Sequence, residues 1–135
     1  MNAEANNHMS KSGRIGIFVI AYNAENKIEQ TLARIPKDVY DRVEVIYVVD
    51  DCSTDDTVQK AVRLKEQYGK LEVIRNRVNR RYGGNQKFGY QHAIDRGLDA
   101  VVMLHADGQY APEMLAELYN PIVGGEADVV FGSRM

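Results

Sequence analysis

The residues in this sequence that are best suited to chemistry lie in the stretch 103–110, MLHADGQY. An apolar run precedes it and predicts a strand, so that His105, Asp107 and Gln109 follow at alternating positions. Carboxylate and amide oxygens with an imidazole beside them can converge on one divalent cation where side chains leave a sheet. A hard cation implies an anionic ligand, most simply a diphosphate. Taken alone, the Asp-Gly pair in this stretch also fits an ordinary turn between a strand and a helix.

Two further polar clusters fall at the ends of predicted strands. Asp50 and Asp51 come directly after a β-rich run, and Tyr22 and Glu25 come after a continuous apolar run. In open parallel sheets, ligands bind outside the carboxyl ends of the strands, near the point where the strand order reverses. We therefore expect the three clusters to share one cleft.

The elements that must position these clusters alternate between strand and helix along the chain. The predicted strands cover residues 15–20, 43–49, 71–74, 100–104 and 128–131. The predicted helices run from Asn23 to before Pro36, from Ser53 or Thr54 to Gly69, from about Asn85 to Arg96, and from Pro112 to about Val123. This alternation predicts an α/β fold with a doubly wound, mostly parallel sheet and helices on both faces.

Length and composition describe one globular domain. The chain has 135 residues, of which 44% are hydrophobic and 27% are charged, with a formal net charge of -2. Residues 1–13 are rich in Asn, Ser and small polar types and are expected to be a disordered leader. Residues 14–135 form the domain, and because strand and helix signals alternate up to the last residue, we expect a domain truncated at its C-terminus.

Composition also limits location and partners. A single cysteine, Cys52, excludes an internal disulfide and fits a reducing, cytoplasmic setting. No apolar run approaches the roughly 20 residues that span a bilayer, although peripheral contact with a membrane stays open. A net charge near zero argues against nucleic-acid binding. A local basic cluster could contact a diphosphate or an anionic membrane, or form a solvated loop; it comprises Arg75, Arg77, Arg80, Arg81 and Lys87.

Other nucleotide and phosphate sites do not fit the sequence. The loop after the first predicted strand reads AYNAEN and has no glycine, which excludes a dinucleotide-binding fingerprint, and no Walker A loop is present. A receiver domain would place its acidic pair after the first strand and not the second. A phosphatase of the D-x-D-x-T type fails because neither acidic cluster has that order after a central strand.

The remaining combination suits a nucleoside diphosphate sugar. Tyr22 can stack on a base, and a carboxylate can accept hydrogen bonds from base N–H groups or ribose hydroxyls. A cation at Asp107 would neutralise the diphosphate, which gains charge as the sugar departs. Each position also has a plainer interpretation, since Tyr22 could pack against a neighbouring helix, and Asp55 and Asp56 suit the first turn of a helix without any ligand.

Four motifs give the chain a resemblance to a known family. They read VIAYNAENKIEQTL, VVDDCSTDDT, NRRYGGNQKFGYQHAI and MLHADGQYAPE. With them, residues 15–134 resemble the family-2 glycosyltransferases of GT-A fold, especially the branch of dolichyl-phosphate mannose synthase and bacterial polyprenyl-phosphate glycosyltransferases. The resemblance implies a Rossmann-like, nucleotide-sugar-binding half of a GT-A domain.

The resemblance also implies roles for individual residues. The fourth motif corresponds to a D-x-D element in which His105 replaces the first Asp, so Asp107 is the expected ligand of Mg or Mn, with Gln109 second. His105 could ligate, or could contact ribose or phosphate. Arg134 would lie near the acceptor or a phosphate. The expected nucleotide-sugar-binding set is Ala21, Tyr22, Glu25, Asp50, Asp51, Lys87, His105, Ala106 and Asp107.

The expected activity is metal-dependent, inverting transfer of a sugar from a nucleoside diphosphate sugar, with a polyprenyl phosphate the favoured acceptor. A phosphate acceptor needs no general base, and residues 111–135 offer no convincing base for a hydroxyl acceptor. The alternatives are a non-catalytic nucleotide-sugar-binding module or inactive fragment, and a metal-binding structural domain. An uncovered last strand would also allow a homo-oligomer.

Overall fold

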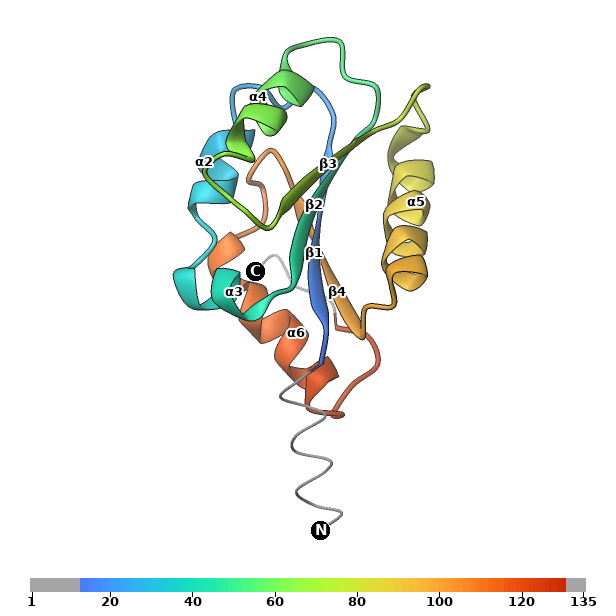
Figure 1. The fold of residues 1–135 in the computed structure, drawn as a ribbon. Helices are drawn as coiled ribbons and strands as arrows, with labels where there is room; N and C mark the ends of the chain where they lie inside the picture. The colour runs from blue at the N-terminus through green and yellow to red at the C-terminus, as the bar shows by residue number, and fades with distance from the viewer. Residues whose placement is uncertain (1–12, 131–135) are drawn as a thin grey trace.

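The computed structural model describes residues 13–130 of the chain (Figure 1). Within that range, four parallel strands form one sheet in the order β3-β2-β1-β4. The strands are β1 (Ile15–Ala21), β2 (Val45–Asp50), β3 (Leu71–Arg75) and β4 (Ala100–His105). All seven residues of β1 are buried, as expected of a β-branched run that is covered on both faces.

The register of the sheet brings three strand ends to one edge. Ala21 at the end of β1 pairs with Asp50 of β2, and Ile20 pairs with His105 of β4. Because the strands are parallel, the residues that follow them leave the sheet at the same edge. The loops after β2 and β4 therefore lie on either side of the loop after β1.

Helices cover both faces of the sheet (Figure 1). One face carries α5 (Arg81–Arg96), which lies against β1 and β4. The opposite face carries α2 (Ile28–Ala33), α3 (Lys37–Arg42), α4 (Thr57–Leu64) and α6 (Leu115–Val123), the last preceded by the 3-10 turn η1 (Pro112–Met114). This arrangement confirms the predicted α/β fold with a doubly wound, parallel sheet.

The buried apolar side chains form a separate core on each face of the sheet. Ile17 and Val19 belong to the core beneath α2, α4 and α6, whereas Phe18 and Tyr47 belong to the core beneath α5. A Cβ on Gly89 of α5 would lie 2.1 Å from the Phe18 ring, so glycine is what allows this helix to approach β1. The Tyr47 hydroxyl donates a hydrogen bond to the Gly89 carbonyl at 2.7 Å.

Gly97 and Pro36 mark helix ends where the sequence predicts, whereas α4 ends at Leu64 and not at Gly69. Gly97 follows α5 in the left-handed conformation, with φ of 76°. Pro36 separates α2 from α3, a six-residue helix that the sequence analysis did not include. Its sequence, KDVYDR, buries one apolar side chain, Val39, so it shows no helical hydrophobic period, which explains the omission.

The predicted helix starts at Asn23 and at Ser53 or Thr54 were wrong, because these residues connect two loops instead. Asn23 Oδ1 accepts a hydrogen bond from the backbone N–H of Thr54 at 2.9 Å, and the Asn23 backbone N–H donates to Ser53 Oγ at 2.8 Å. Helices α2 and α4 begin several residues further along the chain. These bonds hold the loops after β1 and β2 together.

The predicted fifth strand was also wrong over its described part. Residues 128–130 are not in a strand, and Phe131 lies outside the described residues. Val129 and Val130 favour extended backbone, but a strand also needs a partner, and these residues form no ladder with β4 at the end of the sheet. The predicted leader lies outside the described residues except for residue 13. None of the helices described between residues 13 and 130 combines the length and hydropathy needed to cross a bilayer.

Candidate functional site

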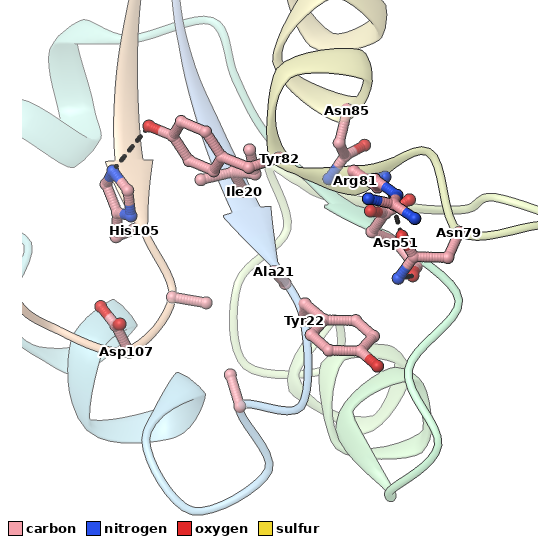
Figure 2. Close-up of a pocket in the computed structure, with 12 residues that line it drawn as sticks. Ile20, Ala21, Tyr22, Asp51, Asn79, Arg81, Tyr82, Asn85, His105 and Asp107 are labelled. Atoms are coloured by element: carbon pink, nitrogen blue, oxygen red, sulfur yellow. Dashed lines mark hydrogen bonds between the residues drawn. The ribbon is translucent and has the colours of Figure 1, made fainter.

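A pocket of about 380 Å³ lies at the carboxyl ends of β1, β2 and β4 (Figure 2). Its position matches the switch point of the sheet, because β2 and β3 follow β1 on one side and β4 lies on the other. The loop after β3 and the first turns of α5 contribute four residues to its lining, Asn79, Arg81, Tyr82 and Asn85. Its lining residues are Ile20, Ala21, Tyr22, Ala24, Asp51, Asn79, Arg81, Tyr82, Asn85, His105, Ala106 and Asp107.

The structure brings six of the residues predicted from the sequence into this pocket, namely Ala21, Tyr22, Asp51, His105, Ala106 and Asp107. Asp50, Glu25, Lys87 and Gln109 are not among the lining residues. Lys87 is exposed on α5, whereas Arg81 at the start of that helix lines the pocket. Arg134 lies outside the described residues.

The two aspartates after β2 have different surroundings. Asp50 is fully buried, and its carboxylate accepts hydrogen bonds from the backbone N–H and the hydroxyl of Ser53. Asp51 lines the pocket, and its Oδ1 accepts hydrogen bonds from the Arg80 backbone N–H at 2.7 Å and from Asn76 at 3.0 Å. Within the described residues no hydrogen bond reaches Asp51 Oδ2, which leaves that oxygen available to a ligand.

Buried amides hold Asp51 in place. Asn76 and Asn85 are only 4% and 1% exposed, and Asn76 donates to both Asp51 Oδ1 and Asn85 Oδ1. Asn85 in turn donates to the Val49 carbonyl at 3.1 Å. Sequence reasoning missed both amides. Asn85 stood in the third motif and could have been found there, whereas Asn76 is one polar residue in a polar loop and gave no signal.

Tyr22 lines the pocket from the loop after β1, and the residue is 51% exposed (Figure 2). Glu25 further along the same loop is tied to α4 through its backbone, since its N–H donates to Asp55 and its carbonyl accepts from Lys60. Burial acts to raise the pKa of Asp55, but hydrogen bonds from Thr57 and Glu25 outweigh it and lower that pKa overall. Asp55 thus accepts a hydrogen bond from the first residue of α4 but precedes the helix, and does not lie in its first turn as the sequence predicted.

His105 lies in an aromatic wall. Its ring centroid is 5.6 Å from that of Tyr82 and 4.7 Å from that of Tyr110, and its Nε2 is 3.2 Å from the Tyr82 hydroxyl (Figure 2). Burial first, and Tyr110 second, raise the pKa of Tyr82, so its hydroxyl keeps its proton at neutral pH. The imidazole is therefore oriented by its ring contacts and by the hydrogen bond with Tyr82.

Asp107 occupies the turn that follows β4. Its Oδ1 accepts a hydrogen bond from the Gln109 backbone N–H at 3.1 Å, and the next residue, Gly108, has φ of 74°. No three His, Cys, Asp or Glu side chains between residues 13 and 130 converge in a way that could hold a metal. The donor set nevertheless fits one kind of site, because Mg²⁺ is commonly bound by one or two carboxylates together with substrate phosphates.

Comparison with known proteins identifies the family. Residues 16–135 match the sequence model described as Glycosyl transferase family 2. The chain belongs to this family. The match covers all four motifs on which the resemblance was based.

Named relatives in family 2 are similar over most of this chain. The UDP-N-acetylglucosamine–dolichyl-phosphate N-acetylglucosaminyltransferase of Methanococcus voltae is 30% identical over 90% of this chain and 52% of its own length. The undecaprenyl-phosphate mannosyltransferase of Micrococcus luteus is 31% identical over 90% of this chain and 48% of its own length. The dolichol-phosphate mannosyltransferase of Pyrococcus furiosus is 30% identical over 90% of this chain and 33% of its own length. The chain thus spans about half the length of these relatives, or less.

Solved structures share the fold. Residues 1–349 of Staphylococcus aureus TarS, in complex with UDP, superpose with a TM-score of 0.59 and 26% identity over 77% of this chain and 30% of that one. The mannosyltransferase PcManGT of Pyrobaculum calidifontis, in complex with GDP-Man and Mn²⁺, gives a TM-score of 0.58 and 25% identity over 70% of this chain and 27% of its own. The family-2 chain therefore has the GT-A architecture that its motifs imply.

Proposed function

We propose that residues 14–135 bind a nucleoside diphosphate sugar and serve metal-dependent, inverting transfer of its sugar to a polyprenyl phosphate. The observation that carries the proposal is one pocket that holds the exposed ring of Tyr22, the buried carboxylate of Asp51 and the exposed carboxylate of Asp107. Its volume of about 380 Å³ suits a small-molecule ligand. Three relatives carry dolichyl, dolichol or undecaprenyl phosphate in their names, and two similar structures hold UDP or GDP-Man.

In this proposal the nucleoside lies on the side of the pocket nearest β2. Tyr22 stacks on the base, and Asp51 Oδ2 accepts a hydrogen bond from a base N–H or a ribose hydroxyl. The small side chains of Ala21 and Ala106 leave room for the nucleotide at the floor. Glu25 is the proposed contact at the rim, through a side chain that is only partly buried.

The diphosphate lies on the side nearest β4. Asp107, with His105 and Gln109 of the same segment, would hold Mg²⁺ or Mn²⁺ there together with two phosphates. The bound cation would supply positive charge that stabilises the departing diphosphate. Arg81 lines the same pocket and offers a guanidinium to a phosphate, whereas Lys87, the member of the basic cluster that was expected in the nucleotide-sugar site, does not line it.

The transfer step is a displacement at the anomeric carbon. An oxygen of the acceptor phosphate forms the new bond as the bond to the diphosphate breaks, and the bonding electrons leave with the diphosphate. Attack from the side opposite the leaving group inverts the anomeric configuration. An acceptor phosphate is ionised at neutral pH, so no side chain has to remove a proton from it.

A basic loop beside the pocket supports contact with a membrane, where a polyprenyl phosphate resides. Arg75, Arg77 and Arg80 are exposed, and Val78 between them is 67% exposed. Lys and Arg near an anionic bilayer contribute about 1 kcal/mol each to binding. Replacing Arg75 and Arg77 together with Gln should reduce co-sedimentation with phosphatidylglycerol vesicles and leave the low binding to phosphatidylcholine vesicles unchanged. Equal sedimentation of both proteins would contradict this contact.

The proposed function is tested by a thermal-shift panel of UDP, GDP, CDP and dTDP, each with and without Mn²⁺. A ligand that binds only the native state raises the melting temperature. We expect at least one diphosphate to stabilise the chain, and to do so more strongly with Mn²⁺. A melting temperature that no nucleotide changes would contradict the proposal and would favour a metal-binding structural domain.

A second candidate function for these residues alone is donor binding without turnover. The observation in its favour is that the chain spans 52% or less of the length of each of the three relatives named above. Holding donor and acceptor in line can contribute roughly 7 to 11 kcal/mol to catalysis, so a chain that holds only the donor would transfer sugar very slowly. Assays with radiolabelled nucleotide sugars and polyprenyl phosphate separate the two, because robust turnover by residues 1–135 would exclude the binding module.

A further inference from the structure

The turn that carries Asp107 is held from both sides by one helix. The Ala106 carbonyl accepts a hydrogen bond from Thr31 Oγ1 at 2.9 Å, and the Gly108 carbonyl lies 3.4 Å from Nη1 of Arg34. Thr31 lies in α2 and Arg34 is the residue that ends it, so the two side chains are three positions apart and share one face of the helix. The peptides on both sides of Asp107 are therefore connected to adjacent side chains of α2.

Arg34 also holds the far end of this segment. Its Nε and Nη2 donate to the two carboxylate oxygens of Glu113 at 2.9 Å and 2.8 Å, a bidentate pair with defined geometry. The hydrogen bond from Arg34 lowers the pKa of Glu113, which keeps this carboxylate ionised at neutral pH. One guanidinium thus bridges the Gly108 carbonyl and the Glu113 side chain, and so connects the two ends of the segment from residue 108 to residue 113.

The turn is packed closely against α2. Thr31 is 2% exposed, and a Cβ on Gly108 would lie 3.1 Å from Thr31 Oγ1 and 3.4 Å from Arg34 Nη1. With φ of 74°, Gly108 also has a backbone conformation that other residues rarely adopt. The contacts of α2 therefore fix where the Asp107 backbone lies as well as which residue can follow it.

We propose that Thr31 and Arg34 are positioning residues that orient the Asp107 carboxylate for the cation and the diphosphate. This inference rests on the proposed function, because it assigns the two residues to the same site. Neither side chain needs to touch the ligand. Instead, they hold the main chain of a residue whose Oδ1 already accepts a hydrogen bond from the Gln109 backbone, so that the carboxylate has one orientation before ligand arrives.

The chain contains a matched control for Arg34. Arg14 makes the same set of bonds at the opposite edge of the sheet, with Nε and Nη2 each 2.7 Å from the Glu44 carboxylate and Nη1 3.2 Å from the Gly97 carbonyl. Both arginines are partly exposed, at 45% and 43% of the side chain. Arg14→Lys therefore removes an equivalent bidentate pair and carbonyl contact without altering the turn at Asp107.

The first measurement is calorimetry of the full chain with Mn²⁺ and the nucleoside diphosphate that the thermal-shift panel identifies. Arg34→Lys and Thr31→Val should each weaken the Mn²⁺-dependent affinity about 10-fold to 100-fold, the range found when groups that orient a metal ligand are removed. Metal-free affinity for the same nucleotide should stay within about twofold in both variants, because the contacts at Tyr22 and Asp51 are untouched. Arg14→Lys should match the wild type in both titrations.

The second measurement is amide hydrogen exchange in the ligand-free chain. The Gly108 N–H donates to the His105 carbonyl and the Gln109 N–H donates to Asp107, so both amides report the order of the turn. Their exchange should be faster in Arg34→Lys and Thr31→Val than in the wild type and Arg14→Lys. If both amide exchange and Mn²⁺-dependent affinity were unchanged in both variants, the positioning role of Thr31 and Arg34 would be overturned and the proposed function would stand. A wild-type chain that binds no nucleotide would instead overturn the proposed function.

Discussion

Asp50 and Asp51 are neighbours in the sequence, yet their carboxylates have different surroundings. Asp50 points into the protein and binds Ser53, whereas Asp51 lines the pocket and is held by Asn76 and the Arg80 backbone. The sequence placed both at a strand end but did not distinguish them. The distinction depends on a buried amide from the loop after β3, which only the paired strands bring within reach.

Replacing each aspartate by alanine should therefore have separate effects. Asp51→Ala should weaken nucleotide binding about 10-fold or more and keep its metal requirement, since a hydrogen bond to a charged group contributes about 1.5 to 3 kcal/mol. Asp50→Ala should lower the free energy of unfolding by a similar amount, because the buried Ser53 donors lose their acceptor. Urea unfolding and calorimetry of both variants provide the comparison. Loss of metal binding in Asp51→Ala with unchanged metal-free affinity would reverse these roles.

Asp107 is the carboxylate expected to bind the cation. Asp107→Asn keeps the size of the side chain and an oxygen that can accept from the Gln109 backbone, but removes the charge that holds a divalent ion. We expect a folded protein whose Mn²⁺-dependent nucleotide affinity falls at least about 10-fold. Circular dichroism checks the fold, and calorimetry measures the affinity. An affinity equal to that of the wild type would remove Asp107 from the metal site.

At the scale of elements, the sequence predicted the parts that have a strong period or a clear boundary. The strands of the sheet appear as β-branched runs because both faces are buried, and Gly97 and Pro36 mark helix ends for steric reasons. The short helix α3 has no visible hydrophobic period in its sequence. The apolar pattern at residues 128–131 predicts extended backbone, but a sequence pattern does not show whether a partner strand is present. Loop contacts such as Asn23 with Thr54 are equally invisible, because they depend on tertiary structure.

The packing of α5 on β1 gives a prediction at the same scale. Gly89→Ala should lower the free energy of unfolding by about 1 to 3 kcal/mol, because the new methyl group would meet the Phe18 ring at 2.1 Å. Gly83→Ala in the same helix has open space around its Cβ and should instead stabilise the protein by about 0.4 to 1 kcal/mol. Urea unfolding measures both. Equal shifts in the two variants would show that α5 does not depend on close contact at Gly89.

At the scale of the molecule, the topology of the sheet accounts for the site. The strand order β3-β2-β1-β4 places the loops after β1, β2 and β4 at one edge, and a single pocket holds side chains from all three loops. This much follows from a parallel sheet, and it explains why six predicted residues meet there. The segment after β3 supplies Tyr82, Arg81 and the buried amides. No local sequence pattern predicted that this segment would pass beside the pocket.

The most direct test of a donor nucleotide at this edge uses the paramagnetism of Mn²⁺. Amide spectra of the ¹⁵N-labelled chain would be recorded with the nucleoside diphosphate that stabilises it, before and after Mn²⁺ is added in small amounts. We expect strong broadening of the signals of His105, Asp107 and Gln109, weaker broadening at Asp51, and sharp signals at Arg14 on the opposite edge. Broadening centred elsewhere, or the same broadening in Asp107→Asn, would contradict this expectation.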